Sequence, residues 1–219
     1  MNKFEHLTTY FEQKHAQEEL IFPSKRVLFV CWANAGRSQI AQGIFSTAYP
    51  YVEVESAGVG DYSHKYEHPH PLVIAEMARH GIDISQNRVK QITEAMITPE
   101  TDVVALCDPT KLPPFVTQMA QSVLGIPVRD PYTSRKAPIA SENPLAIGIR
   151  HTYEKLDFMI QNHLLDIMKA VRENGFTRLT QDGIIYPYAP KQIEEISPTT
   201  YLVTPHSDAS PHNAQISPQ

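Results

Sequence analysis

The sequence predicts an α/β domain built on a parallel β-sheet with helices on both faces. Short apolar runs of the kind found in buried strands alternate along the chain with segments whose apolar residues recur at helical spacing. Strands that alternate with helices pair in parallel through right-handed crossovers. The chain has 219 residues, of which 42% are hydrophobic, and a chain of this length buries a sizeable core without disulfides or a structural metal.

The first strand, loop and helix set the pattern. Residues 27–31 form a continuous β-favouring run, Val-Leu-Phe-Val-Cys, which is typical of a strand buried on both faces. A short loop at 32–36 follows directly. From Ser38 to Pro50, apolar residues recur at helical spacing, which predicts a helix over these residues.

The rest of the domain repeats this alternation, and one long amphipathic segment closes it. The expected elements are a strand at 51–55 ending in a turn at 56–58, a helix at 71–80 capped by Gly81, a strand at 102–107, a short helix at 113–124, a short strand at 125–128 and a closing helix at 144–174.

The strand and helix pattern covers residues 25–174, which we predict to form one domain. Before it, apolar residues at helical spacing predict an accessory helix within residues 1–24 that packs on the domain. After it, residues 175–219 are rich in proline and polar residues with almost no periodic apolar pattern, which predicts a partly disordered extension. We therefore expect one domain with two terminal extensions.

Composition excludes several kinds of site. Lys and Arg number 19 against 24 Asp and Glu, a formal net charge of −5, so no global basic field exists for nucleic acid or an anionic membrane. Two cysteines exclude a disulfide framework and a four-cysteine zinc site, and they suit a reducing compartment. Any anion must therefore be held by a local arrangement of donors.

Nothing in the sequence predicts a membrane segment. Charged residues interrupt the first 25 residues, where a secretory signal would need an apolar stretch. The most apolar run, residues 27–33, is shorter than the roughly 20 residues that cross a bilayer. We expect a cytoplasmic protein.

A cysteine, five intervening residues, an arginine and a serine stand between the first strand and the first helix, from Cys31 to Ser38. In open α/β sheets, ligands bind at the carboxyl ends of strands. Five residues let the backbone curl so that its N–H groups point into one concavity at the helix N-terminus, which suits a tetrahedral oxyanion. Arg37 adds a planar fork for two oxygens of that anion. The predicted oxyanion-binding residues are Trp32, Ala33, Asn34, Ala35, Gly36 and Ser38.

Cys31 lies at the base of this predicted loop. The positive field that holds an oxyanion also favours a thiolate over a thiol, and the Ser38 hydroxyl is placed to donate a hydrogen bond to that thiolate. A thiolate below a bound tetrahedral oxyanion is set up for in-line attack. The alternative is a small apolar residue that ends a buried strand, but the strand, helix and serine around it favour the functional interpretation.

These residues resemble the low-molecular-weight protein tyrosine phosphatase family, which includes the structurally similar arsenate reductases. The resemblance covers residues 25–172 and leaves out both extensions. The segments that carry it are Val27–Cys31, Asn34, Arg37–Gln39, Ser56–Gly58, His70–Pro71, Gly81–Ser85, Leu106–Asp108 and Asp130–Tyr132.

The resemblance implies a three-layer αβα domain with a four-stranded parallel, flavodoxin-like sheet, and neither a metal nor a cofactor. It also implies that Cys31 is a nucleophile, that Arg37 and the loop amides bind the oxyanion, and that an Asp-Pro aspartate is the general acid. Asn34 would shape the loop. Ala33 departs from the family pattern, because many members have glycine at this position, and its Cβ is expected to tighten the loop.

Attack on a phosphate monoester expels a poor leaving group unless it is protonated in the transition state. Two Asp-Pro pairs follow strands, at Asp108 and Asp130. Asp130 agrees with the family position and precedes Tyr132, an aromatic residue expected to wall the substrate cleft. The alternative for either aspartate is a turn residue that bonds its own backbone. Two interpretations of Trp32 are equally favoured by the sequence: a role at the pocket rim, and packing against a neighbouring loop.

Three functions remain open at this stage. The first is a phosphatase that acts on a phosphorylated protein or a small phosphomonoester through a phosphocysteine. The second is an arsenate reductase in which Cys107 resolves the adduct; with no cysteine in residues 108–115, its disulfide would need an external thiol. Cys107 is otherwise a buried strand residue. The third is a non-catalytic anion-binding module, against which the presence of Cys31, Arg37 and Asp130 argues.

Three weaker features complete the sequence analysis. His64, His68 and His70 are expected to be solvated loop residues and not metal ligands, because prolines break their spacing and no cysteine is near. The basic residues Arg129, Arg135 and Lys136 are expected to be a solvated loop, although they lie beside the proposed acid and would favour anionic substrates. For the C-terminal extension at 175–219, the sequence is compatible with disorder and with docking of a protein partner.

Overall fold

The computed structural model describes residues 24–126, 128–133, 143–174, 177–179 and 185–187. Its centre is a four-stranded sheet in the order β2-β1-β3-β4, and every pair of neighbours is parallel. The strands are β1 (Arg26–Cys31), β2 (Glu53–Gly58), β3 (Thr101–Ala105) and β4 (Ser122–Gly125). The predicted α/β class with a four-stranded parallel sheet is confirmed.

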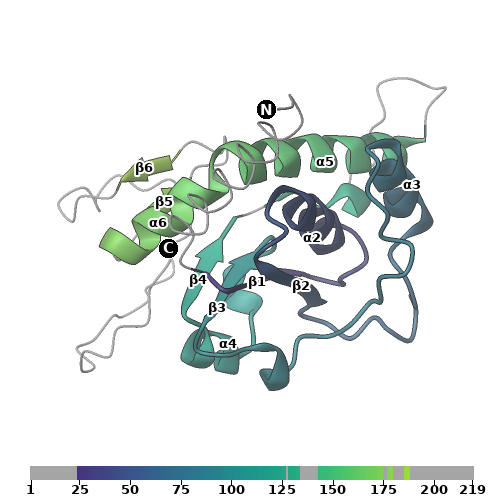
Figure 1. The fold of residues 1–219 in the computed structure, drawn as a ribbon. Helices are drawn as coiled ribbons and strands as arrows, with labels where there is room; N and C mark the ends of the chain where they lie inside the picture. Colours follow the sequence, from purple (N-terminus) through teal and green to yellow (C-terminus); the bar gives the residue numbers. More distant parts are fainter. Residues whose placement is uncertain (1–23, 127, 134–142, 175–176, 180–184, 188–219) are drawn as a thin grey trace, which may run out of the picture.

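Helices cover the sheet on both faces (Figure 1). The four longer helices pack on one face, whereas α4 and the 3₁₀ turn η1 lie on the other. The helices of the first face are α2 (Arg37–Ala48), α3 (Pro71–Arg79), α5 (Pro144–Asn162) and α6 (Leu164–Asn174). The shorter elements are α4 (Pro114–Met119), η1 (Glu94–Met96), η2 (Pro109–Lys111) and η3 (Pro131–Thr133).

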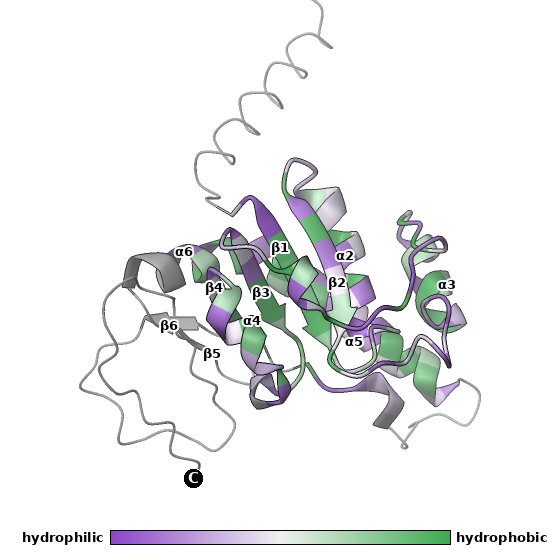
Figure 2. Cartoon of the chain, turned by 90° about the horizontal axis from the view of Figure 1, so that it is seen from below, coloured by the Kyte–Doolittle hydropathy of each residue, from purple (hydrophilic) through white to green (hydrophobic). Residues whose placement is uncertain are grey.

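Strand β1 is the centre of the core. Val27 and Phe29 face the layer of α2 and α5, whereas Leu28 and Val30 face the layer of α4 and η1, and all four side chains are fully buried. A strand buried on both faces needs apolar residues at every position, which explains the uninterrupted apolar run. Figure 2 shows the same pattern, with hydrophobic residues along the central strands.

The register brings the carboxyl ends of the strands to one edge of the sheet. Cys31, the last residue of β1, pairs with Gly58, the last residue of β2, and Val30 pairs with Ala105 at the end of β3. The loops after the three strands therefore meet at this edge, which is where ligands bind in open α/β sheets.

Several predicted boundaries are wrong for reasons of tertiary structure. Residues 56–58, predicted as a turn, continue β2 because they pair with the end of β1. The predicted closing helix is two helices that meet at His163, and this break lets Leu164 and Ile167 turn into the core, where both are fully buried. The predicted short helix ends earlier, at Met119 of α4, and the predicted fourth strand begins and ends earlier, at Ser122–Gly125 of β4.

The extensions are described only in part. The predicted N-terminal helix lies outside the described residues, as does most of the predicted C-terminal extension. Two short strands of that extension, β5 (Thr177–Leu179) and β6 (Ile185–Pro187), form an antiparallel pair. Among the described helices, none is long and apolar enough to cross a membrane.

The end of β2 lies unusually close to the loop that follows β1. A Cβ added to Gly58 would lie 2.9 Å from the carbonyl carbon of Ala33 and 3.0 Å from the amide nitrogen of Asn34. Both contacts are with backbone, which cannot move aside as a side chain can. Glycine at this position therefore allows the loop to rest directly on the sheet edge.

We predict that Gly58→Ala lowers the free energy of unfolding by about 1–3 kcal/mol, because the added methyl group overpacks rigid backbone. Gly60→Ala is the matched control: a Cβ there would meet the ring of the Tyr62 side chain at 2.8 Å, and that ring can turn aside. Chemical denaturation of both variants tests this difference. Equal losses in the two variants would contradict the close approach.

Candidate active site

The loop at 32–36 connects Cys31 to α2, and its carbonyl oxygens are tied to the surrounding segments. Cys31 O accepts a hydrogen bond from Val59 N, Trp32 O from Gly60 N and Ala35 O from His70 N, each at 2.9 Å. In the described chain, no backbone hydrogen bond outside helices and strands uses an N–H of residues 32–38. No side chain caps the N-terminus of α2 either. The donors of the loop and first helical turn are thus left for an anion.

Asn34 fixes the shape of this loop. Its φ of 55° is in the left-handed region, which asparagine tolerates better than most residues but at some energetic cost. The side chain is fully buried and makes four hydrogen bonds. Its Nδ2 donates to Ser38 Oγ (3.0 Å) and Ser56 Oγ (2.9 Å), and its Oδ1 accepts from Gln39 Nε2 (3.1 Å) and Lys90 N (3.0 Å). All donors and acceptors of the amide are therefore used.

The bond from Asn34 leaves the hydroxyl proton of Ser38 available for Cys31. An amide NH₂ only donates, so Ser38 Oγ is the acceptor of Asn34 and keeps its own hydroxyl proton for another partner. Cys31 Sγ lies 3.0 Å from this oxygen, and Ser38 is fully buried from water. A thiolate can only accept hydrogen bonds, so when Cys31 is ionised the Ser38 hydroxyl is the donor and stabilises the thiolate form.

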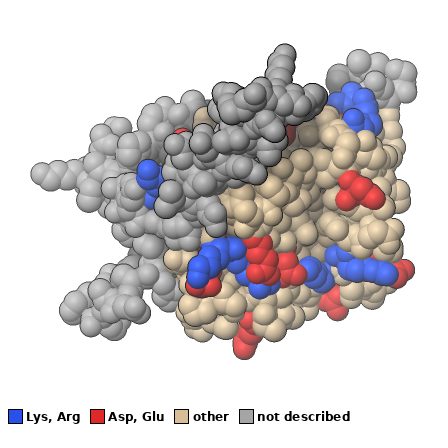
Figure 3. Space-filling view, viewed as in Figure 1, with Lys and Arg blue, Asp and Glu red and all other residues tan. Residues whose placement is uncertain are grey.

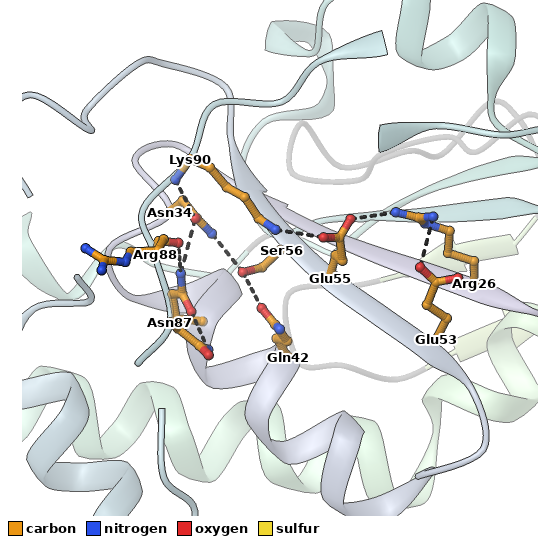
Figure 4. A network of polar contacts seen from close by, with 10 residues as sticks. Arg26, Asn34, Gln42, Glu53, Glu55, Ser56, Asn87, Arg88 and Lys90 are labelled. Carbon is orange, nitrogen blue, oxygen red and sulfur yellow. Dashed lines mark hydrogen bonds and ion pairs between the residues drawn. The ribbon is translucent and has the colours of Figure 1, made fainter. Parts of the chain in front are cut away.

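A second layer of polar contacts supports Asn34 (Figure 4). Gln39 Oε1 accepts from Asn87 Nδ2 at 2.9 Å, and Ser56 Oγ donates to Gln42 Oε1 at 2.7 Å. Lys90 also reaches along the edge of the sheet, where its Nζ pairs with Glu55 at 2.8 Å. The segment at 87–90 thereby acts as a strap that holds the loop from the side of β2.

Arg37 joins the loop to the ends of β3 and β4. Its Nη1 donates to Leu106 O at 3.1 Å and to Val128 O at 2.9 Å, while its Nη2 pairs with Asp130 Oδ2 at 3.0 Å. The arginine side chain is only 9% exposed, and that of Asp130 is 32% exposed. The other carboxylate oxygen accepts from Tyr132 N at 3.0 Å. The guanidinium is therefore held in one orientation beside the loop.

The two Asp-Pro aspartates differ in their surroundings. Asp108 caps the short turn η2, where its Oδ1 accepts from both the amide and the hydroxyl of Thr110. Asp108 is therefore a turn residue, which was the alternative predicted for either aspartate. Asp130, in contrast, contacts the arginine of the loop, so the structure brings Asp130 and not Asp108 to Arg37.

Aromatic residues border the loop. Trp32 is 42% exposed and donates its indole N–H to the Tyr62 hydroxyl at 2.9 Å. Tyr132 lies on the other side, where its ring is 3.4 Å from the position a Cβ of Gly36 would occupy. The ring of His70 packs edge-on against that of Tyr132, with centroids 5.5 Å apart. Trp32 is thus bonded to a neighbouring loop, as one of the two predictions had it, and its side chain is partly exposed.

Cys107 is buried two residues after the end of β3, within electrostatic reach of Cys31. Burial raises the pKa of its thiol to about 11, and a negative charge on Cys31 adds to this rise, while the Arg37 guanidinium opposes it. Both cysteines are free. At neutral pH Cys107 is therefore a protonated thiol within the electrostatic reach of the candidate nucleophile.

The histidines singled out in the sequence have structural contacts. His68 Nδ1 bonds to Asn87 O at 2.9 Å, and His70 Nδ1 accepts from Leu72 N at 3.2 Å to cap α3. No group of three or more His, Cys, Asp or Glu side chains in the described part of the chain could hold a metal ion.

Sequence reasoning missed the residues that hold the loop in place. Lys90 acts on Asn34 directly and Asn87 acts on it through Gln39, both from a segment with no motif of its own, and Tyr62 was not singled out. Gln39 itself lies in a segment that resembles the family. Ser56 and His70 had a signal, because both lie in short segments that resemble the family. The carbonyl groups that orient Arg37 carry no sequence signal, since any residue supplies one.

A family comparison agrees with this geometry. The model of the low molecular weight phosphotyrosine protein phosphatases matches residues 26–176, which is more than half of the chain. The chain belongs to this family. The match begins with β1 and includes Cys31, Arg37, Cys107 and Asp130, so all of these residues lie within the family domain.

Individual relatives share parts of this domain. A protein of Ralstonia nicotianae named "Probable low molecular weight protein-tyrosine-phosphatase EpsP" is 38% identical over 85 residues, which are 38% of this chain and 56% of that protein. The namesake from Ralstonia solanacearum is 42% identical over 74 residues, 33% of this chain and 49% of that protein. The matched part therefore spans about half the length of these relatives.

Solved structures of the family have the same fold. Wzb of Vibrio vulnificus in complex with benzylphosphonate superposes with a TM-score of 0.51 at 18% identity, covering 63% of this chain and 95% of that one. A structure described as an arsenate reductase in the phosphate binding state gives a TM-score of 0.51 at 26% identity, covering 65% of this chain and 97% of that one. The expected flavodoxin-like fold is thus confirmed.

The surroundings of His70 predict a pH-dependent stability. Burial lowers its pKa below the ordinary value of about 6.5, and its Nδ1 must be unprotonated to cap α3. The unfolded chain therefore takes up this proton first as the pH falls, so the stability that neutral His70 contributes is complete above about pH 6.5 and is lost as the pH falls through the folded-state pKa.

We expect the free energy of unfolding of the wild type to decrease between pH 7.5 and 5 more steeply than that of His70→Asn, in which the amide oxygen can cap the helix without titrating. Chemical denaturation across this range gives the two profiles. Parallel profiles would show that His70 does not contribute.

Proposed function

We propose that this protein is a phosphatase that hydrolyses phosphate monoesters of the phosphotyrosine type through a phosphocysteine intermediate. The observation that carries the proposal is the Ser38 hydroxyl, 3.0 Å from Cys31 Sγ, at the base of a loop and helix N-terminus whose donors are left for an anion. Membership of the phosphatase family supports the same function.

The proposed reaction has two steps, formation of the phosphocysteine and its hydrolysis. In the first, the thiolate of Cys31 attacks phosphorus, an S–P bond forms, and the P–O bond to the leaving group breaks as Asp130 gives that oxygen a proton. In the second, the Asp130 carboxylate takes a proton from water, whose oxygen attacks phosphorus. The S–P bond then breaks to return the thiolate and release inorganic phosphate.

Arg37 has a different partner before and during this reaction. Its Nη2 now pairs with Asp130 at 3.0 Å, and a bound phosphoryl group offers oxygens that compete for the same guanidinium. Transfer of Arg37 to the phosphoryl oxygens ends its ion pair with Asp130, so that this carboxyl group can turn to the leaving-group oxygen. The loop amides of residues 32–38 bind the remaining oxygens.

The substrate is a phosphorylated protein or a small phosphomonoester with an aromatic leaving group. Trp32 and Tyr132 support this specificity, because each is about two-fifths exposed beside the loop and presents an aromatic face to a ring. We place the protein in the cytoplasm, where a reducing environment keeps Cys31 reduced. The C-terminal extension, outside the described residues for most of its length, would dock a protein partner.

Two substitutions test the phosphatase function with an aryl phosphate. Cys31→Ser should abolish turnover, because it removes the nucleophile. Asp130→Asn should lower kcat for phenyl phosphate by about 10²–10⁴, since the leaving group then departs without a proton. The measurement is steady-state hydrolysis at pH 6–7.

Asp108→Asn is the matched control, because it changes the other Asp-Pro aspartate and should retain kcat within about twofold. Turnover that survives in Cys31→Ser would disprove the phosphocysteine mechanism. A wild type that binds phosphate but turns over no aryl phosphate would favour the non-catalytic module.

One observation favours a second candidate, arsenate reduction: Cys107 is buried within electrostatic reach of Cys31. Arsenate would esterify the Cys31 thiolate with loss of water. The Cys107 thiolate would then attack Cys31 Sγ to form a disulfide, and the electron pair of the broken S–As bond would reduce As(V) to As(III), released as arsenite. An external thiol would reopen the disulfide.

We predict that Cys107→Ser abolishes any thiol-dependent arsenate reduction and retains phenyl phosphate hydrolysis within a few-fold. The reduction rate of the wild type should rise between pH 7 and 9, because the pKa of Cys107 near 11 leaves little thiolate at neutral pH. Reduction assayed with a small dithiol tests both points. Absence of reduction in the wild type, or unchanged reduction in Cys107→Ser, would exclude this candidate.

A further inference from the structure

A small basic pocket lies on the far side of the segment that carries Asp130. Its volume is about 170 Å³, and it opens between residues 128–131 and helix α5. Its lining includes Arg129, Pro131, Gly148, His151, Thr152 and Lys155. We call this site the basic pocket.

The side chains of the basic pocket suit an anion. Arg129, His151 and Lys155 are exposed at its rim, and none of its described lining residues is acidic. Within the described chain, neither Arg129 nor His151 has a hydrogen bond or ion pair. The hydroxyl of Thr152 is already committed, since it donates to Gly148 O at 2.8 Å. Recognition therefore depends on the basic side chains, of which Arg129 offers a fork for two oxygens.

The size of the basic pocket limits its ligand. Sites for drug-sized molecules occupy about 300–1,000 Å³, and one water takes up about 30 Å³. A volume of about 170 Å³ therefore suits one carboxylate or phosphate group with a few waters and is too small for a cofactor. The chain as a whole is acidic, and Figure 3 shows basic and acidic side chains interspersed on the face drawn, so this grouping of basic residues is local.

The basic pocket and the candidate active site share one loop. Arg129 and Pro131 line the pocket, and Asp130 between them pairs with Arg37. The loop rests on α5 at Gly148, where an added Cβ would lie 3.2 Å from Pro131 O. An extended chain advances about 3.3–3.6 Å per residue, so a side chain only a few residues from a bound phosphotyrosine reaches across this loop.

We propose that the basic pocket binds an anionic side chain of the substrate, a carboxylate or a second phosphate, close in sequence to the phosphotyrosine. This inference rests on the proposed phosphatase function and adds a preference for acidic segments. The whole-chain charge of −5 opposes such substrates, so the local pocket supplies the attraction.

The test compares two phosphotyrosine peptides that differ only in having glutamates or glutamines beside the phosphotyrosine. For the wild type we expect kcat/KM to be about five- to tenfold higher for the acidic peptide at low salt, and less at high salt because the pocket is open to solvent. In Arg129→Gln/Lys155→Gln this preference should fall to within about twofold, while hydrolysis of phenyl phosphate is unchanged.

Lys25→Gln/Arg79→Gln is the matched control, because it removes the same charge elsewhere on the surface and should keep the preference. Equal kcat/KM for both peptides in the wild type, a preference that survives in the pocket variant, or its equal loss in the control would each overturn the proposal. So would free succinate that raises turnover of the neutral peptide, because the pocket would then serve a free anion.

Failure of the proposed function gives a different result. A wild type that does not hydrolyse phenyl phosphate refutes the phosphatase, whereas the basic pocket is then measured by binding of the same peptides with a phosphonate in place of the phosphate. Tighter binding of the acidic peptide to the wild type, reduced in the pocket variant only, would support the pocket independently of turnover. Equal binding would refute it.

Discussion

The amide side chain of Asn34 is the constraint on which the rest of the site depends. It is buried, all of its donors and acceptors are used, and it holds its own backbone at a positive φ that only a network of this kind sustains. By donating to Ser38 it also leaves the serine proton available for a thiolate at Cys31. One side chain thus sets both the curvature of the oxyanion loop and the electrostatics of the sulfur.

Arg37 plays a complementary part on the other side of the loop. The carbonyl groups of Leu106 and Val128 hold its guanidinium. The position of Arg37 therefore depends on how the strands β1, β3 and β4 are arranged. The same guanidinium holds Asp130, which means that the oxyanion ligand and the proposed acid are coupled before any substrate arrives. In the proposed reaction, substrate binding exchanges Asp130 for phosphoryl oxygens as partners of Arg37.

In the proposed function, groups close to the site allow an acidic chain to bind an anionic substrate. The helix N-terminus and the loop amides attract an oxyanion over a few ångströms, where the net charge of the molecule has little effect. The basic pocket applies the same principle one residue away from Asp130. Cys107 lies at the same sheet edge, where burial raises the pKa of its thiol to about 11.

The sequence by itself determined the fold class, the loop from Cys31 to Ser38 and the family, because these depend on local patterns: an apolar run for a doubly buried strand and a fixed spacing before a helix. The resemblance already favoured Asp130 over Asp108, and only the tertiary structure shows that Asp130, and not Asp108, contacts Arg37. The strap of residues 87–90, the break at His163 and the basic pocket also required it. Each arises from segments that are distant in sequence and meet only when the sheet has formed.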